Sequence, residues 1–295
     1  MRWTPGGESG NIEDRRGSGG IGPVHVGIGG TVILLVLSLI FGRDFVSDNT
    51  NPNPYSAGGT AAGSLGPGGP GGPGAPVNES PEEAREVQFV SFVLDTAQAM
   101  WARILPATTG TAWRPAKLVL FRDATATGCG VGQTAMGPFY CPVDQKLYID
   151  LAFYDELRSR FGAPGEFAQA YVLAHELGHH VQHLLGIDAA VRRAQQRDPS
   201  AANDLSVRLE LQADCFAGVW GHETQGEGIL EPGDLQSGLN AAASVGDDRI
   251  QRETTGHVNT DTFTHGSSAQ RVYWFKRGFD SGQPKDCDTF SGAIQ

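Results

Sequence analysis

The sequence is poor in cations and in cysteine. It contains 22 Lys and Arg against 33 Asp and Glu, which gives a formal net charge of −11. This balance argues against nucleic-acid binding, because that affinity comes largely from basic contacts with phosphates. Four cysteines in 295 residues are too few for a disulfide scaffold, and no Cys-x-x-Cys pair occurs. No repeat with a period of about 20–50 residues is visible, which argues against solenoids and propellers.

Glycine divides the chain into two unequal parts. Residues 1–76 contain 20 of the 41 glycines, and they include a Gly/Pro run at 66–74. A segment of this composition cannot bury a core, so no independent fold is expected there. The remaining 219 residues have an ordinary glycine content and are enough for one sizeable domain or two small ones.

An uncharged apolar run interrupts the glycine-rich part. Residues 17–42 contain no Asp, Glu, Lys or Arg, and the stretch 24–42 is close to the length that spans a bilayer. A cleaved signal peptide is the alternative, but no small-x-small site follows closely. Three arginines precede the run and one follows it before residue 85, so the positive-inside rule places the N-terminus in the cytoplasm.

These features predict a single-pass protein of the cell membrane. We expect a cytoplasmic tail at 1–23, a transmembrane signal anchor at 24–42, a flexible Gly/Pro-rich linker at 43–79 and an extracytoplasmic domain at 80–295.

The last of these parts has the pattern of an α+β domain, mainly helical with a small sheet. Ser80 followed by Pro81 is typical of a helix start, and Pro106 is expected to end that helix. Short apolar runs predict strands at 117–122 and 146–150. Helical periodicity predicts further helices at about 166–185, 204–222, 233–246 and 268–279.

The four cysteines allow three connectivities. Cys129 and Cys141 bracket a loop between the two predicted strands, which is typical of a hairpin closed by a disulfide. Proximity therefore favours this pair and leaves Cys215 with Cys287, provided that the domain lies outside the cytoplasm.

The sequence His-Glu-Leu-Gly-His at 175–179 carries the clearest chemistry. Four residues apart on a helix, His175 and His179 project from one face and can bind one metal ion, with Glu176 beside it. Gly178 is expected to let another element approach this helix closely. The spacing predicts a Zn²⁺ site with Glu176 as general base.

A catalytic zinc usually has a third protein ligand. Glu210 and Asp214 lie four residues apart on a helix that is apolar nearly all round, so these acids need partners. We expect Glu210 to bind the metal and Asp214 to orient a ligand histidine. A solvated helix face is the alternative for both residues.

The developing oxyanion of an acyl-transfer reaction needs a further hydrogen-bond donor. His265 and Arg271 are the candidates for this catalytic role. A surface loop and an arginine at a helix start are the respective alternatives.

Several segments together resemble one bacterial family. They are Met-Arg-Trp at 1–3, Asn-Ile-Glu-Asp-Arg-Arg at 11–16, Gly-Pro-Phe-Tyr-Cys-Pro at 137–142, residues 175–180 and 210–220, Thr-His-Gly-Ser at 264–267 and Trp-Phe-Lys-Arg-Gly-Phe at 274–279. The chain resembles the neutral zinc metallopeptidases called the YpfJ-like proteins. The resemblance implies a membrane-anchored, zincin-like domain with ligands His175, His179 and Glu210.

The predicted function is therefore that of a membrane-anchored zinc metalloendopeptidase acting on polypeptides. Two alternatives stay open at this point. One is a catalytically silent zincin that serves as an envelope scaffold, and the other is a zinc amidase that acts on cell-wall peptide.

Overall fold

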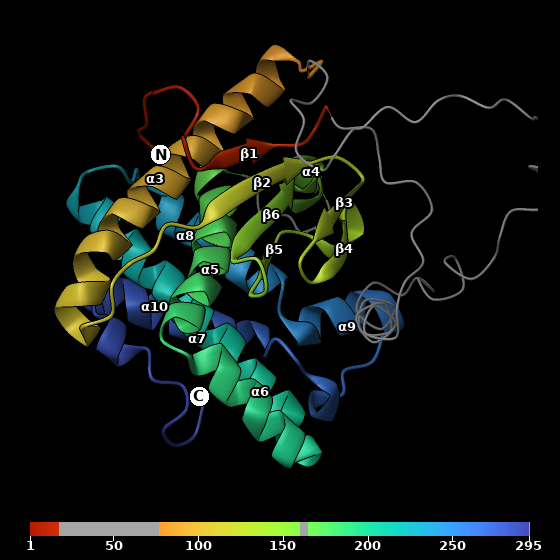
Figure 1. Cartoon of the computed structure of the whole chain (residues 1–295). Coiled ribbons are helices and arrows are strands. Elements are labelled where there is room, and N and C mark those ends of the chain that lie inside the picture. Colours follow the sequence, from red (N-terminus) through yellow and green to blue (C-terminus); the bar gives the residue numbers. More distant parts are fainter. Residues whose placement is uncertain (18–76, 160–164, 295) are drawn as a thin grey trace, which may run out of the picture.

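The structure is a computed structural model, and it describes residues 1–17, 77–159 and 165–294 (Figure 1). The strands are β1 Ile12–Asp14, β2 Lys117–Phe121, β3 Ala124–Thr127, β4 Gly130–Gln133, β5 Phe139–Cys141 and β6 Lys146–Asp150. The helices are α3 Pro81–Thr109, α4 Ala152–Ser159, α5 Glu166–Leu184, α6 Ile187–Arg197, α7 Ala202–Gly226, α8 Asp234–Ser244, α9 Asp247–Thr255 and α10 Ser268–Ser281. The predicted α+β character, mainly helical with a small sheet, is confirmed.

A mixed four-stranded sheet has the order β1-β2-β6-β5. β1, β2 and β6 run parallel, and β5 pairs antiparallel with β6 at one edge. The two predicted strands therefore do not flank a simple hairpin, since they pair with each other in parallel. The hairpin lies between them as β3 and β4. Its turn holds Cys129, which is bonded to Cys141 of β5.

Both predicted disulfides, Cys129–Cys141 and Cys215–Cys287, are present. The first ties the β3–β4 turn to the edge strand β5. The second ties the C-terminal segment to α7, where Cys215 is fully buried. Each bridge thus connects an element of the cleft described below to a neighbouring part of the chain.

The helix α3 begins as predicted but ends later. The Ser80 hydroxyl accepts a hydrogen bond from the backbone N–H of Glu83 at 3.1 Å. Pro106 does not end the helix, which continues to Thr109 and terminates at Gly110 with φ 75°. Because Pro106 lies in the last turn, its missing N–H removes only one helical hydrogen bond, and Gly110 supplies the left-handed cap.

Glycines bring α7 and α10 unusually close together. A Cβ on Gly278 would lie 1.9 Å from the carbonyl oxygen of Cys215, and one on Gly218 would lie 2.0 Å from that of Phe275. Gly178 has the role predicted for it, because a Cβ there would lie 3.0 Å from the backbone of Ala213 in α7. This close packing fixes α5, α7 and α10 against one another.

Residues 1–17 belong to the same folded unit as the helices. β1 pairs with β2 in the register Ile12 with Leu118, and β1 lies beside α3 and β2 in Figure 1. The Arg16 guanidinium bonds to Glu79 at 2.8 Å, and the Ser9 hydroxyl bonds to Asp95 at 2.5 Å. The prediction of a separate tail at 1–23 is therefore wrong for these residues, because they complete the sheet.

The predicted anchor at 24–42 and the linker at 43–79, except its last three residues, lie outside the described residues. Within the part of the chain that the structure does describe, no helix combines the length and the apolar character needed to cross a bilayer.

Candidate metal centre

The floor of the candidate site is the helix α5. It is apolar on most sides and packs against α7 and α8, so most polar residues of its middle turns are buried, while His179 is half-buried. His175 and His179 lie one turn apart, with ring centroids 4.8 Å from each other. The possible ligand atoms of His175, Glu176 and His179 all lie within 4.8 Å of one another.

Glu210 of α7 faces both imidazoles. Its carboxylate oxygens lie 3.2 Å from Nε2 of His175 and 3.5 Å from Nε2 of His179. Two ligands at about 2.05 Å from one tetrahedral zinc are separated by about 3.3–3.4 Å. The observed separations therefore fit donor atoms that share one zinc ion.

A buried cluster of Asp214, Tyr171 and Arg271 supports His175 on the Nδ1 side of its imidazole ring. Its Nδ1 lies 2.9 Å from Asp214, whose side chain has no solvent exposure. Asp214 also accepts hydrogen bonds from the Tyr171 hydroxyl and from the Arg271 guanidinium, the latter at 2.8 and 2.9 Å. A carboxylate in this position fixes the imidazole so that Nε2 faces Glu210, where these residues could hold a metal ion.

Arg271 consequently has a different position from the one that an oxyanion donor needs. It is 4% exposed, and its guanidinium binds both oxygens of Asp214. We therefore assign Arg271 to holding Asp214 and no longer to the oxyanion.

The second histidine is held by Gln182, which the sequence reasoning missed. Nδ1 of His179 lies 2.8 Å from the Gln182 amide oxygen, and the amide nitrogen donates to the backbone carbonyl of Leu209 in α7. The neighbouring His180 points away from the site, because its ring nitrogens contact the Tyr140 hydroxyl and the carbonyl of Arg114.

His265 enters the cleft from the loop before α10. Its Nδ1 lies 3.1 Å from Asp247. The other oxygen of Asp247 accepts backbone N–H groups of Thr264, His265 and Gly266. Asp247 thus fixes both the loop and the imidazole. Sequence reasoning missed it because nothing in its local sequence indicates this contact.

The ionisable groups of the floor perturb one another strongly. Burial raises the pKa of Glu176 to about 7. Burial alone would lower the pKa of His175, but Asp214 outweighs it and raises that pKa to about 10. Burial opposes ionisation of Glu210 too, yet the two histidines hold its pKa well below the usual range. The centre therefore favours added positive charge, which a divalent cation would supply.

A cleft of about 420 Å³ lies over this floor. One wall consists of residues 135–140 and Pro142, which include most of the edge strand β5, together with residues of α4. Residues of α6 and α7 and the segment containing His265 form the remaining walls. One open cleft therefore contains three candidate metal ligands, the carboxyl group of Glu176 beside them, and the imidazole of His265, which Asp247 fixes in place.

The geometry defines a class of protein, and the family comparison agrees with it. Residues 1–290 match the model of the family described as "Putative neutral zinc metallopeptidase", and the chain belongs to this family. The family suggests a hydrolase that uses zinc.

Among individual proteins, the chain is 48% identical to the uncharacterized protein YpfJ of Escherichia coli strain K12, with both chains covered completely. It is 49% identical to an uncharacterized protein of Mycobacterium tuberculosis strain H37Rv, over 68% of this chain and 69% of the relative. No solved structure matches the chain.

Proposed function

We propose that this protein is a zinc metalloendopeptidase in which Glu176 is the general base. The observation that supports this most is the convergence of Glu210 with Nε2 of both His175 and His179, directly beside Glu176, in an open cleft. Two histidines and one carboxylate are a donor set of catalytic zinc sites in metallopeptidases, and a neighbouring carboxyl that does not bind the metal is their general base.

When bound, zinc would activate a water molecule and polarise the scissile carbonyl. Glu176 would take the proton of the attacking water and deliver it to the leaving amine. A carboxyl group with a pKa near neutrality is suited to both steps. His265, positioned by Asp247, would donate a hydrogen bond to the developing oxyanion.

The edge strand β5 favours a polypeptide as substrate. Among the residues that the structure describes, it pairs with one strand, β6, and it lines the cleft beside the metal centre. A free strand edge can bind an extended peptide through backbone hydrogen bonds, which requires no particular side chains. Such binding would carry a scissile bond along the floor past Glu176.

The test is cleavage by the full-length chain, because residues 1–17 are part of the fold. We expect hydrolysis of casein that is lost on zinc chelation and restored by one equivalent of Zn²⁺. Purified peptidoglycan serves as the second substrate, and its cleavage without cleavage of casein would favour the amidase alternative. Casein hydrolysis that is insensitive to chelation would contradict the proposal.

We further propose an extracytoplasmic position for the whole folded unit, including residues 1–17. Two disulfides support an oxidising compartment. A single crossing at 24–42 would separate β1 from β2 by a membrane, and the observed pairing argues against that topology. On this proposal both ends of segment 18–76 lie on the same side of the membrane.

Single cysteines at two exposed positions test this placement in intact cells. A membrane-impermeant maleimide should label both Glu8→Cys and Arg252→Cys. Both positions are exposed, the first within residues 1–17 and the second within the described part that follows segment 18–76. Labelling at Arg252→Cys alone would contradict the proposal that residues 1–17 lie on the same side of the membrane as the rest of the folded unit. Labelling at neither position, with labelling restored by cell lysis, would contradict the extracytoplasmic position.

A further inference from the structure

The rim of the cleft carries a charged group that the chemistry above does not use. Arg192 of α6 lines the cleft, and its side chain is 50% exposed. The other arginine of the cleft lining, Arg271, is committed to Asp214. Among the described residues that line the cleft, Arg192 is thus the arginine whose guanidinium is open to a ligand.

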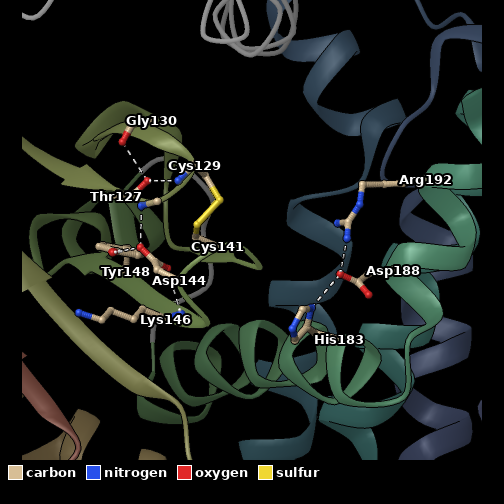
Figure 2. The surroundings of a disulfide bond; sticks show 11 residues. Thr127, Cys129, Gly130, Cys141, Asp144, Lys146, Tyr148, His183, Asp188 and Arg192 are labelled. Atoms are coloured by element: carbon tan, nitrogen blue, oxygen red, sulfur yellow. Dashed lines mark hydrogen bonds and ion pairs between the residues drawn. A yellow bond between two sulfur atoms is a disulfide. The ribbon is translucent and has the colours of Figure 1, made fainter.

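Asp188 holds Arg192 in place at one end of its guanidinium. The Asp188 carboxylate lies 3.1 Å from a terminal nitrogen of Arg192 and 3.0 Å from Nδ1 of His183, and its other oxygen accepts the backbone N–H of Ala189 at 2.6 Å. Figure 2 shows Arg192 reaching to Asp188, with His183 on the other side of the same carboxylate. Asp188 is only 10% exposed, so this anchor is buried while the arginine is open to solvent.

The position of this pair relates it to the predicted path of a substrate. Tyr140 of β5 packs near His183, with ring centroids 6.2 Å apart, and both Tyr140 and Asp188 line the cleft. Figure 1 shows α6 at the opposite end of α5 from α4, and residues of both α4 and α6 line the cleft. A peptide that pairs with β5 and passes the metal centre would reach α6 at this end.

We propose that Arg192 is a specificity-determining residue that binds a carboxylate of the peptide substrate, a proposal that rests on the peptidase function above. A guanidinium has five N–H donors in a planar fork, and Asp188 contacts one terminal nitrogen of it. The remaining donors suit bidentate binding of a carboxylate, which is either an acidic side chain or the C-terminal carboxylate.

Binding is measured with the full-length Glu176→Gln variant, loaded with Zn²⁺, so that peptides are not consumed. The probes are fluorescent ten-residue peptides that carry one Glu at successive positions, with matched Gln peptides. Each is made with a free and with an amidated C-terminus, which separates the two sources of carboxylate. We expect one Glu position, or the free C-terminus, to improve the Kd about tenfold over its match.

The variant Arg192→Gln should lose this preference, and Arg192→Lys should keep part of it. Arg193→Gln is the matched control, because Arg193 is the next residue of α6, is exposed and does not line the cleft. In the active enzyme, which retains Glu176, the Arg192→Gln substitution should raise KM for the preferred peptide about tenfold and leave kcat unchanged.

Equal binding of Glu and Gln peptides, or an equal effect of the Arg192 and Arg193 substitutions, would overturn the inference. A preference that depends on Arg192 in a protein that cleaves nothing would support the inference while contradicting the proposed catalysis. The two proposals therefore fail separately.

Discussion

The floor of the cleft and its rim hold their polar groups in different ways. On the floor, Asp214 is completely buried and bonds to His175, Tyr171 and Arg271, which come from α5 and α10. On the rim, Arg192 has one ion pair and is half exposed. Groups fixed by several buried partners cannot change without loss of the centre, whereas a rim residue can. The comparison suggests that the reaction is built into the floor and that selectivity for substrates is built into the rim.

The largest expected effect separates two carboxyl groups of the same cleft. Glu176→Gln removes the proposed base and should lower kcat about 10²–10⁴-fold, while one zinc per chain is retained. Glu156→Gln on α4 is the control at the wall, and it should change kcat less than threefold, which is about 0.65 kcal/mol. Peptide hydrolysis and metal analysis of both variants check this prediction. If both variants lost activity, or if neither did, the floor of the cleft would not differ from its periphery in the way proposed.

The next prediction concerns the packing that fixes the floor. Gly278→Ala would force α10 away from α7, because its Cβ would meet the Cys215 carbonyl at 1.9 Å. We expect a loss of about 1–3 kcal/mol or more in the free energy of unfolding. Gly226→Ala is the control, since no atom lies within 4 Å of its Cβ position at the end of α7. Denaturant unfolding measures both, and equal stabilities would show that the close approach does not fix the floor.

A smaller effect is expected when the support of one histidine is weakened. Asp214→Asn removes the charge that orients His175 and should reduce zinc affinity about 10–100-fold. Tyr171→Phe removes one hydrogen bond to the same carboxylate and keeps its charge, so zinc affinity should change much less. Competition with a zinc chelator measures both affinities. An unchanged affinity in Asp214→Asn would mean that His175 does not depend on this support.

The smallest effect lies far from the cleft, where residues 1–17 join the sheet. Burial opposes ionisation of Asp14 and Glu83, but arginines outweigh it and lower the pKa of both carboxyls. The two carboxylates therefore stabilise the attachment of residues 1–17 to the sheet fully at pH values above their unfolded pKa values, about 4. This stabilisation is lost as the pH falls through the lower folded values. These groups are partly exposed, so we expect less than about 1 kcal/mol.

Limited proteolysis within 1–17 between pH 5 and pH 3, by an acid-active protease, measures this attachment. As the pH is lowered, proteolytic cleavage within residues 1–17 should increase before cleavage within α5 begins. The Arg16→Gln variant removes a partner of both carboxyls and should show a smaller pH dependence, while Glu13, whose burial is outweighed by Lys146 so that its pKa is lowered, still titrates. A dependence that is undiminished in Arg16→Gln would contradict the assigned cause.

Local spacing explains which parts of the centre could be predicted. Positions four apart on a helix share a face, and this relation connects His175 to His179 and Glu210 to Asp214. The same spacing relates Tyr171 to His175, so that contact could have been inferred from the sequence. Asp247 could not, because its contact with His265 depends on the folding of a loop.

The same limit applies to the fold. Long periodic helices such as α5 and α7 were predicted close to their observed bounds, and α4, α6 and α9, which are short, were missed. β1 has three residues, and its partner β2 lies about 100 positions further along the chain. No local pattern specifies such a pairing, so residues 1–17 were wrongly separated from the domain.

The central claim is that one zinc ion is bound by two imidazoles and one carboxylate on the floor of the cleft. X-ray absorption at the zinc edge, on the full-length protein and on Glu210→Gln, tests it most directly. The account predicts one zinc per wild-type chain, nitrogen and oxygen ligands at about 2.0–2.1 Å with no sulfur, and a changed ligand shell in Glu210→Gln. Absence of stoichiometric zinc, or an identical shell in the variant, would contradict it.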